Sequence, residues 1–194
     1  MTYRLGLTGS IGMGKSTAAS MFREMGVPVW DADEAVHRLY AAGGAAVGPV
    51  AAVFPTALAQ GAIDRAMLKQ ALAAAPVMLD RLEAIVHPLV AADRAGFLDR
   101  HRASDLVVLD IPLLFETGAR EVVDGVAVVS TDAGTQRRRV LARPGMTDET
   151  LGLILARQMP DAEKRARADW LIPSDTPEGA RAAITAIIDE ITHA

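Results

Sequence analysis

The sequence contains no cysteine, which excludes disulfide bonds, thiolate metal sites and a cysteine nucleophile. Only 4% of the residues are aromatic, so the chain lacks the stacking surfaces typical of proteins that bind single-stranded nucleic acid. No run of about 18 apolar residues is present, and the first residues lack the apolar stretch of a secretory signal. These absences predict a protein without a membrane span that works in a reducing compartment, for which we expect the cytoplasm.

The formal net charge is −4, from 20 basic and 24 acidic residues, and this balance disfavours a protein that binds nucleic acid over its whole surface. Lysine is scarce, with three lysines against 17 arginines. Codon preference explains such a bias by itself, yet it makes a lysine in a demanding position stand out. With 194 residues, 51% of them hydrophobic, the chain is expected to form one compact domain with an insert.

Short apolar segments alternate with longer helical patterns, which is typical of an α/β protein with a parallel sheet covered by helices. The candidate strands are residues 3–8, 27–30, 105–111, 126–130 and 170–172. The third segment is almost entirely apolar, as expected for a central strand buried on both faces.

The stretch between the second and third candidate strands carries no strand signal. Its residues are rich in alanine and leucine at helical spacing, and a crossover between parallel strands needs only about a dozen residues. We therefore expect residues 32–103 to form a helical insert, with residues 1–31 and 104–194 forming the core.

A phosphate-binding loop follows the first strand. The spacing G-x-x-x-x-G-K-[ST] is met by Gly9-Ser10-Ile11-Gly12-Met13-Gly14-Lys15-Ser16, followed by Thr17. Glycines let successive N–H groups point at phosphate oxygens, and the start of the following helix adds positive charge. Lys15 is the candidate to reach the β- and γ-phosphates, and the Ser16 hydroxyl is the candidate ligand of Mg²⁺. The loop predicts binding of a nucleoside triphosphate with Mg²⁺.

Three absences narrow the class of protein. The chain has no Asn-Lys-x-Asp element of a GTPase and no H-R-D loop of a protein kinase. Near the end of the third strand, Asp110 is followed by Ile111 and not by the glutamate usual in motor and transporter ATPases. A kinase for a small metabolite fits best.

Three aspartates have alternative interpretations. Asp31 and Asp33 follow the second strand, where one carboxylate can take the proton of an acceptor hydroxyl and either can cap the next helix; we favour Asp33 as the base. Asp110 is a candidate to hold Mg²⁺ through water, or else to orient the phosphate loop.

Residues 137–167 hold eight basic and four acidic side chains, a local charge of +4 within an acidic protein. Arg139 and Arg143 are four residues apart, which predicts a shared helical face and a common anion. Such arginines suit a lid that closes over a transferring phosphoryl group, although a solvated amphipathic helix gives the same pattern.

Over nearly its whole length the sequence resembles the dephospho-CoA kinases. The residues that carry the resemblance are the phosphate loop with Leu7 and Thr8, Asp31-Ala32-Asp33, Ile63-Asp64-Arg65, Leu82-Glu83-Ala84-Ile85-Val86-His87-Pro88, Pro112-Leu113-Leu114-Phe115-Glu116, Gln136 with Arg139 and Arg143, Arg157-Gln158, and Lys164-Arg165-Ala166-Arg167-Ala168-Asp169. The order of these elements is more specific than the phosphate loop alone, which many kinases share.

The resemblance implies that the ATP γ-phosphate is transferred to the ribose 3′-hydroxyl of dephospho-CoA, the last step of coenzyme A synthesis. It implies a P-loop fold of three α/β/α layers with a five-stranded parallel sheet, a helical CoA-binding insert and a lid at about residues 138–165. Asp33 is then the base, and Lys15, Arg139 and Arg143 are the other catalytic residues. On the acceptor side the resemblance puts His87, Pro112, Leu113 and Glu116, together with Asp33. For His87, which precedes Pro88, a helix end is the competing interpretation.

The sequence departs from the family in two places. Pro173-Ser174-Asp175 stands where the family usually has an asparagine-containing turn near the adenine, and Met13 stands where serine is frequent. We expect ATP, Mg²⁺ and dephospho-CoA to be the ligands of a monomer or weak homo-oligomer that binds neither nucleic acid nor membrane. The alternatives are another small-molecule kinase or a non-catalytic ATP sensor.

Overall fold

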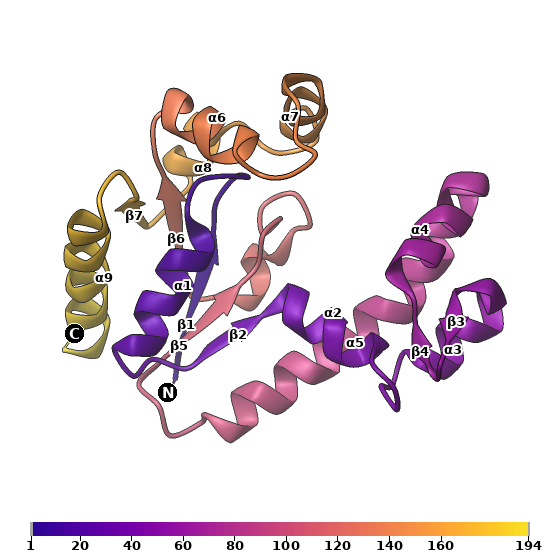
Figure 1. Cartoon of the computed structure of the whole chain (residues 1–194). Helices are drawn as coiled ribbons and strands as arrows, with labels where there is room; N and C mark the ends of the chain where they lie inside the picture. Colours follow the sequence, from indigo (N-terminus) through magenta and orange to yellow (C-terminus); the bar gives the residue numbers. More distant parts are fainter. Residues whose placement is uncertain (1, 194) are drawn as a thin grey trace. The chain divides into compact units, whose positions relative to one another are not determined.

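The computed structural model describes residues 2–193, which divide into two compact units (Figure 1). Residues 2–30 and 101–193 form one unit, and Asp31–Arg100 forms the other. Among residues 2–193 no helix is long and apolar enough to cross a membrane.

A five-stranded sheet organises the first unit. In the order in which they lie side by side, its strands are β2 (Val29–Asp31), β5 (Leu106–Asp110), β1 (Tyr3–Thr8), β6 (Gly125–Ser130) and β7 (Trp170–Pro173). The pairs β1–β5, β1–β6 and β6–β7 are parallel. Every residue of β5 and β6 is buried. The predicted α/β class with a parallel five-stranded sheet is confirmed.

Helices of the first unit cover one face of this sheet and surround its carboxyl edge (Figure 1). They are α1 (Lys15–Glu24), the 3₁₀ turn η3 (Ala119–Val122), α6 (Ala133–Leu141), α7 (Asp148–Leu155), α8 (Asp161–Ala166) and α9 (Pro177–Thr192). The core on one face of the sheet joins α1 and α9 through side chains such as Phe22 and Ile184, neither of which is exposed to solvent. Side-chain caps start three of these helices, with Asp132 before α6, Thr147 before α7 and Thr176 before α9.

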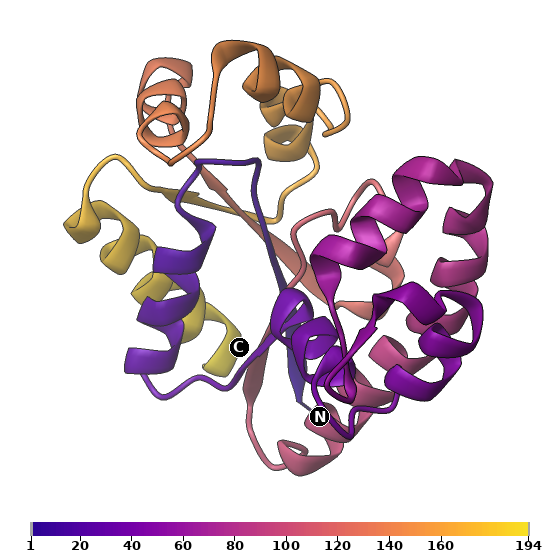
Figure 2. The same cartoon turned by 45° about the vertical axis from the view of Figure 1, so that its right-hand side comes forward.

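The second unit is helical, with a small hairpin (Figure 2). Its elements are α2 (Ala32–Tyr40), α3 (Val47–Val53), η1 (Pro55–Ala57), β3 (Leu58–Ala59), β4 (Ala62–Ile63), α4 (Arg65–Ala74), η2 (Pro76–Met78) and α5 (Leu79–Arg100). It has a core of its own, in which Leu39, Val50 and Leu82 are buried. An ion pair between Arg38 and Asp93, at 2.7 Å, joins α2 to α5.

Two local expectations were wrong. The second strand is Val29–Asp31 and not residues 27–30, because the Val27 N–H bonds the Phe22 carbonyl at the end of α1. The hairpin of β3 and β4 lies where no strand was expected. Its two-residue turn, Gln60-Gly61, has positive φ at both positions, as a tight hairpin requires. Strands of two residues are too short to give an alternating pattern in a sequence.

Candidate active site

The loop Gly9–Gly14 joins β1 to α1 and has the geometry of an anion site. Gly12 and Gly14 have φ of 78° and 92°, in the left-handed region that favours glycine. α1 begins at Lys15, directly after Gly14, with no side chain capping its first turn. The first N–H groups of a helix have no acceptor within it, and the helix dipole adds partial positive charge there. The loop therefore offers hydrogen-bond donors to a phosphate group.

Lys15 forms an ion pair with Asp110, the last residue of β5. Asp110 is 1% exposed, so its charge lies in a poorly solvated position where a cationic partner lowers the cost of burial. Asp110 was considered either to hold Mg²⁺ through water or to orient the phosphate loop. The contact with Lys15 is one through which it orients the loop.

The Ser16 side chain lies in the first turn of α1 and is exposed to solvent. A hydroxyl and a carboxylate such as Asp110 are hard oxygen donors of the kind that Mg²⁺ prefers in phosphate sites. The residues at this place therefore fit the ion that the phosphate-loop motif implies.

Two glutamines from outside the loop hold the backbone of Ile11. Gln136 of α6 donates from Nε2 to the Ile11 carbonyl at 2.8 Å. The Ile11 N–H donates to Gln158 Oε1 at 3.1 Å. Gln136 is buried on a regular helix, whereas Gln158 lies in the turn between α7 and α8. Both polar groups of this residue are therefore satisfied by the protein.

Ser174 connects the other part of the loop to Arg139. Its hydroxyl donates to the Met13 carbonyl at 2.6 Å, and Arg139 bonds both the Ser174 hydroxyl and its carbonyl, at 2.9 and 2.6 Å. The Met13 sulfur accepts the Thr131 N–H at 3.3 Å. Both departures from the family pattern, at Met13 and at Pro173-Ser174-Asp175, thus lie in contacts that support the phosphate loop.

Arg139 and Arg143 do not share a helical face, and this expectation was wrong. α6 ends at Leu141, and Arg143 lies beyond it, before Pro144 and Gly145. Proline and glycine after the helix stop its continuation. Other basic residues of the stretch bind carboxylates: Arg137 contacts Asp148 at 2.5 Å, and Arg167 contacts Glu163 at 3.7 Å.

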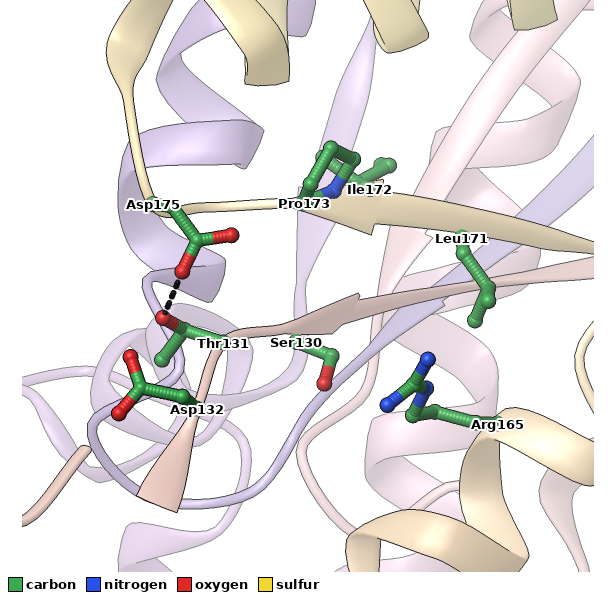
Figure 3. Close-up of a pocket in the computed structure, with 8 residues that line it drawn as sticks. All are labelled: Ser130, Thr131, Asp132, Arg165, Leu171, Ile172, Pro173 and Asp175. Atoms are coloured by element: carbon green, nitrogen blue, oxygen red, sulfur yellow. Dashed lines mark hydrogen bonds between the residues drawn. The ribbon is translucent and has the colours of Figure 1, made fainter. Parts of the chain in front are cut away.

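A hollow of about 390 Å³ lies at the carboxyl ends of β6 and β7 (Figure 3). Thr131 and Asp175 lie on one side, where the Thr131 hydroxyl donates to the Asp175 carboxylate at 2.5 Å, and Arg165 and Leu171 lie on the other. The remaining lining residues are Ser130, Asp132, Ile172 and Pro173. No residue of the phosphate loop lines this hollow.

In the second unit the two aspartates of the Asp-Ala-Asp element differ clearly. Asp31 Oδ1 accepts the N–H groups of Asp33 and Glu34, at 2.8 and 3.0 Å, and so caps α2. The Asp33 side chain is exposed in the first turn of α2. The capping interpretation therefore applies to Asp31, and Asp33 is the carboxylate that points to solvent.

His87 is exposed on α5, and the interpretation that it ends a helix was wrong. Pro88 lies inside α5, which continues to Arg100. Pro112 and Leu113, in the first unit, follow β5; Pro112 is half-buried and Leu113 is 39% exposed. The Pro112 carbonyl accepts the buried Thr8 hydroxyl at 3.1 Å.

Glu116 is engaged inside the protein. Its Oε1 accepts the Met159 N–H at 2.8 Å and lies 2.8 Å from the ammonium of Lys164, a residue with no exposed surface. Burial raises the pKa of Glu116, but Lys164 and the Met159 N–H favour the charged form, so that the net pKa lies below the usual 4.5. Oε2 is buried and has no hydrogen-bond partner among the described residues.

Sequence reasoning did not find the contacts of Gln158, Ser174 and Lys164. The only signal in the sequence was their place in family motifs, or at a departure from one, because their partners lie far away along the chain. The contact between Ile11 and Gln158, for example, spans 147 positions.

We predict that Gly12→Ala weakens ATP binding by roughly tenfold, because phosphate-binding donors act only when they are held in place. A Cβ at position 12 would lie 2.5 Å from Val140 Cγ2 and 3.1 Å from the Gln136 carbonyl, so the loop or α6 must shift. Gly26→Ala is the matched control, since Gly26 also has positive φ (83°) but nothing within 4 Å of the added Cβ. Both variants should lower the melting temperature. Equal ATP affinities by calorimetry would contradict the prediction.

We predict that Glu116 makes stability pH-dependent. Because its pKa is lower in the folded protein, its contribution is complete above the unfolded pKa, near 4.5, and is lost as the pH falls through the folded pKa. Urea unfolding between pH about 6 and 3 should show a smaller loss of stability for Glu116→Gln than for the wild type. The control is Glu163→Gln, whose ion pair with Arg167 is exposed and screened by solvent. Parallel curves for wild type and Glu116→Gln would rule this out.

Known proteins provide the remaining comparison. The family model for dephospho-CoA kinase matches residues 3–178. The dephospho-CoA kinase of Jannaschia sp. (strain CCS1) is 57% identical over 193 residues, covering 100% of this chain and 99% of that protein. A crystal structure of a Thermus thermophilus protein superposes with a TM-score of 0.85 at 35% identity, over 97% of each chain. The dephospho-CoA kinase structure from Campylobacter jejuni, at 20% identity and a TM-score of 0.70, shares the fold over 100% of this chain and 99% of its own. With a matching family model over most of its length and such relatives, the chain belongs to the dephospho-CoA kinase family.

Proposed function

We propose that the protein transfers the γ-phosphoryl group of ATP to the ribose 3′-hydroxyl of dephospho-CoA, giving coenzyme A and ADP. The observation that carries this proposal is the family match over residues 3–178, joined to a complete phosphate loop with its lysine on Asp110. A full-length relative at 57% identity bears the same activity in its name.

In this proposal the loop Gly9–Gly14 and the first turn of α1 bind the ATP phosphates. Backbone N–H groups and Lys15 neutralise charge on the phosphate oxygens, and Lys15 exchanges its contact with Asp110 for the nucleotide. Ser16 would hold Mg²⁺, with Asp110 as its partner through water. Bound there, the ion would supply positive charge to the phosphate oxygens.

Asp33 is proposed as the general base. Its exposed carboxylate accepts the proton of the 3′-hydroxyl while the hydroxyl oxygen bonds to the γ-phosphorus. The bond from that phosphorus to the bridging oxygen breaks, and ADP leaves with the electron pair. Asp31 does not compete for this role, because its carboxylate caps α2.

His87, Pro112 and Leu113 are proposed to line the acceptor side, and the helical unit Asp31–Arg100 to bind the CoA moiety. For Glu116 we propose no direct contact with the acceptor, because Oε1 is occupied by Met159 and Lys164 and Oε2 is buried.

The segment at about residues 138–165 is proposed as a lid. Arg139 and Arg143 would stabilise negative charge on the transferring group and help to exclude water. We further propose that the protein works in the cytoplasm on small molecules, as a monomer or weak homo-oligomer.

The proposed reaction is tested by incubating the pure protein with ATP, Mg²⁺ and dephospho-CoA and detecting coenzyme A by mass spectrometry. We expect coenzyme A with the wild type and a rate at least about a hundredfold lower with Lys15→Ala, because the lysine contacts the transferring group. Arg181 lies on the surface of α9 and pairs with Glu24 of α1. Arg181→Ala removes this cation and should keep the wild-type rate. The absence of coenzyme A above the enzyme-free control would refute the proposed activity.

Asp33→Asn should lower kcat by about a hundredfold or more while ATP still binds, because the amide cannot accept the proton. Glu34→Gln is the matched control, since it removes the same charge from the same turn of α2. We expect its kcat to stay within about twofold of the wild type. A near-wild-type rate for Asp33→Asn, measured with saturating dephospho-CoA, would exclude Asp33 as the base.

A further inference from the structure

The phosphate loop depends on a chain of contacts that ends at a buried ion pair. Ile11 precedes Gly12, whose φ of 78° belongs to a conformation that glycine adopts freely and also leaves freely. The orientation of the two peptide groups that flank Ile11 sets the direction in which the loop enters Gly12. The Ile11 carbonyl is held by Gln136 and the Ile11 N–H by Gln158.

The two holding residues are not equally secure. Gln136 is 7% exposed and lies in the regular helix α6. Gln158 is half-buried and lies between the end of α7 at Leu155 and the start of α8 at Asp161. A side chain in such a turn loses conformational freedom when it binds, so its contact with Ile11 is weak unless the turn is fixed by other interactions.

Glu116 supplies that fixation. Its Oε1 accepts the N–H of Met159, the residue next to Gln158, and the same oxygen lies 2.8 Å from Lys164 Nζ. Lys164 is fully buried on α8 and its own N–H bonds the Pro160 carbonyl at 3.0 Å. One carboxylate oxygen therefore joins the turn to the helix that follows it.

A buried lysine is costly, and an apolar residue of similar volume often stabilises a fold as well or better. The position of this ion pair, one residue from the contact to the phosphate loop, suggests a use beyond stability. We propose that Glu116 and Lys164 are positioning residues that act through Met159 and Gln158 to hold the backbone of Ile11 in its ATP-binding orientation. This inference rests on the proposed function of the loop in binding ATP.

The test measures the Kd of ATP with Mg²⁺ by calorimetry, together with the melting temperature. Gln158→Ala should raise Kd by about three- to tenfold, the range expected for one lost hydrogen bond. Glu116→Ala should raise Kd to a similar extent, whereas Glu116→Gln keeps an acceptor for the Met159 N–H but leaves Lys164 without its counter-charge, so its Kd should lie between those of the wild type and Glu116→Ala. In steady-state kinetics the KM for ATP should rise and kcat should change little, because a looser loop raises the cost of binding and leaves the bound geometry intact.

The decisive measurement is the double variant. If Glu116 acts through Gln158, then Gln158→Ala with Glu116→Ala should have the Kd of Gln158→Ala alone. The proposal would be overturned if the fold-increases in Kd of the two single variants multiplied in the double variant. It would also be overturned by a Glu116→Ala variant with a lower melting temperature and an unchanged Kd. If Glu116→Ala does not fold, Lys164→Met alone and combined with Gln158→Ala takes its place, with the same expectations.

Asp124→Asn is the matched control. It disrupts another ion pair of the same unit. Asp124 Oδ2 accepts the backbone N–H of Arg4 at 2.8 Å and the Arg4 side-chain Nε–H at 2.9 Å. We expect it to lower the melting temperature and leave Kd unchanged. If the wild type does not bind ATP, the proposed function is refuted. If the wild type binds ATP and Gln158→Ala has the same Kd, only the positioning role is refuted.

Discussion

A phosphate-binding loop must keep most of its N–H groups available for a ligand, so few of its own hydrogen bonds hold it in shape; within Gly9–Gly14 the Met13 N–H donates to the Ser10 carbonyl at 3.1 Å. In this protein the surrounding elements supply the missing support. Lys15 is held by Asp110 at the end of β5, Ile11 by glutamines after β6 and after α7, and Met13 by Ser174 after β7. Asp110, Gln136 and Ser174 follow the carboxyl ends of strands, where a parallel sheet gathers its loops, and Gln158 lies in the turn after α7. The sheet therefore positions the elements that support the phosphate loop.

Basic side chains of residues 137–167 also take part in contacts that support the structure. A stretch with a net charge of +4 lies within an acidic protein, yet several of its cations already have partners. Arg137 and Arg167 pair with neighbouring carboxylates, and Lys164 is buried against Glu116. Arg139 bonds Ser174, and so a residue expected to act on the phosphoryl group also supports the phosphate loop. Much of the positive charge of this segment is therefore used within the protein's own structure.

Two carboxylates close together in the sequence lie in different surroundings. Asp31 satisfies the N–H groups that open α2, and this leaves the exposed Asp33 on the first turn. A capped helix start is a rigid support, so it suits a base that must meet a hydroxyl proton within hydrogen-bond distance. Capping and catalysis were alternatives for this pair in the sequence, and the structure assigns the capping to Asp31.

What the sequence by itself determined is local in origin. The apolar segments predicted the sheet, and Gly9–Ser16 predicted the phosphate loop, because strand burial and glycine spacing are visible within a few residues. The end of α6 before Pro144 was missed although its signal is local. The support of the loop was decided only by tertiary structure. Gln158 meets Ile11 across 147 positions and Ser174 meets Met13 across 161, and no periodicity connects residues at such separations. The burial of Lys164 is of the same kind, since a lysine in a basic stretch indicates an exposed cation until the fold brings a carboxylate to it.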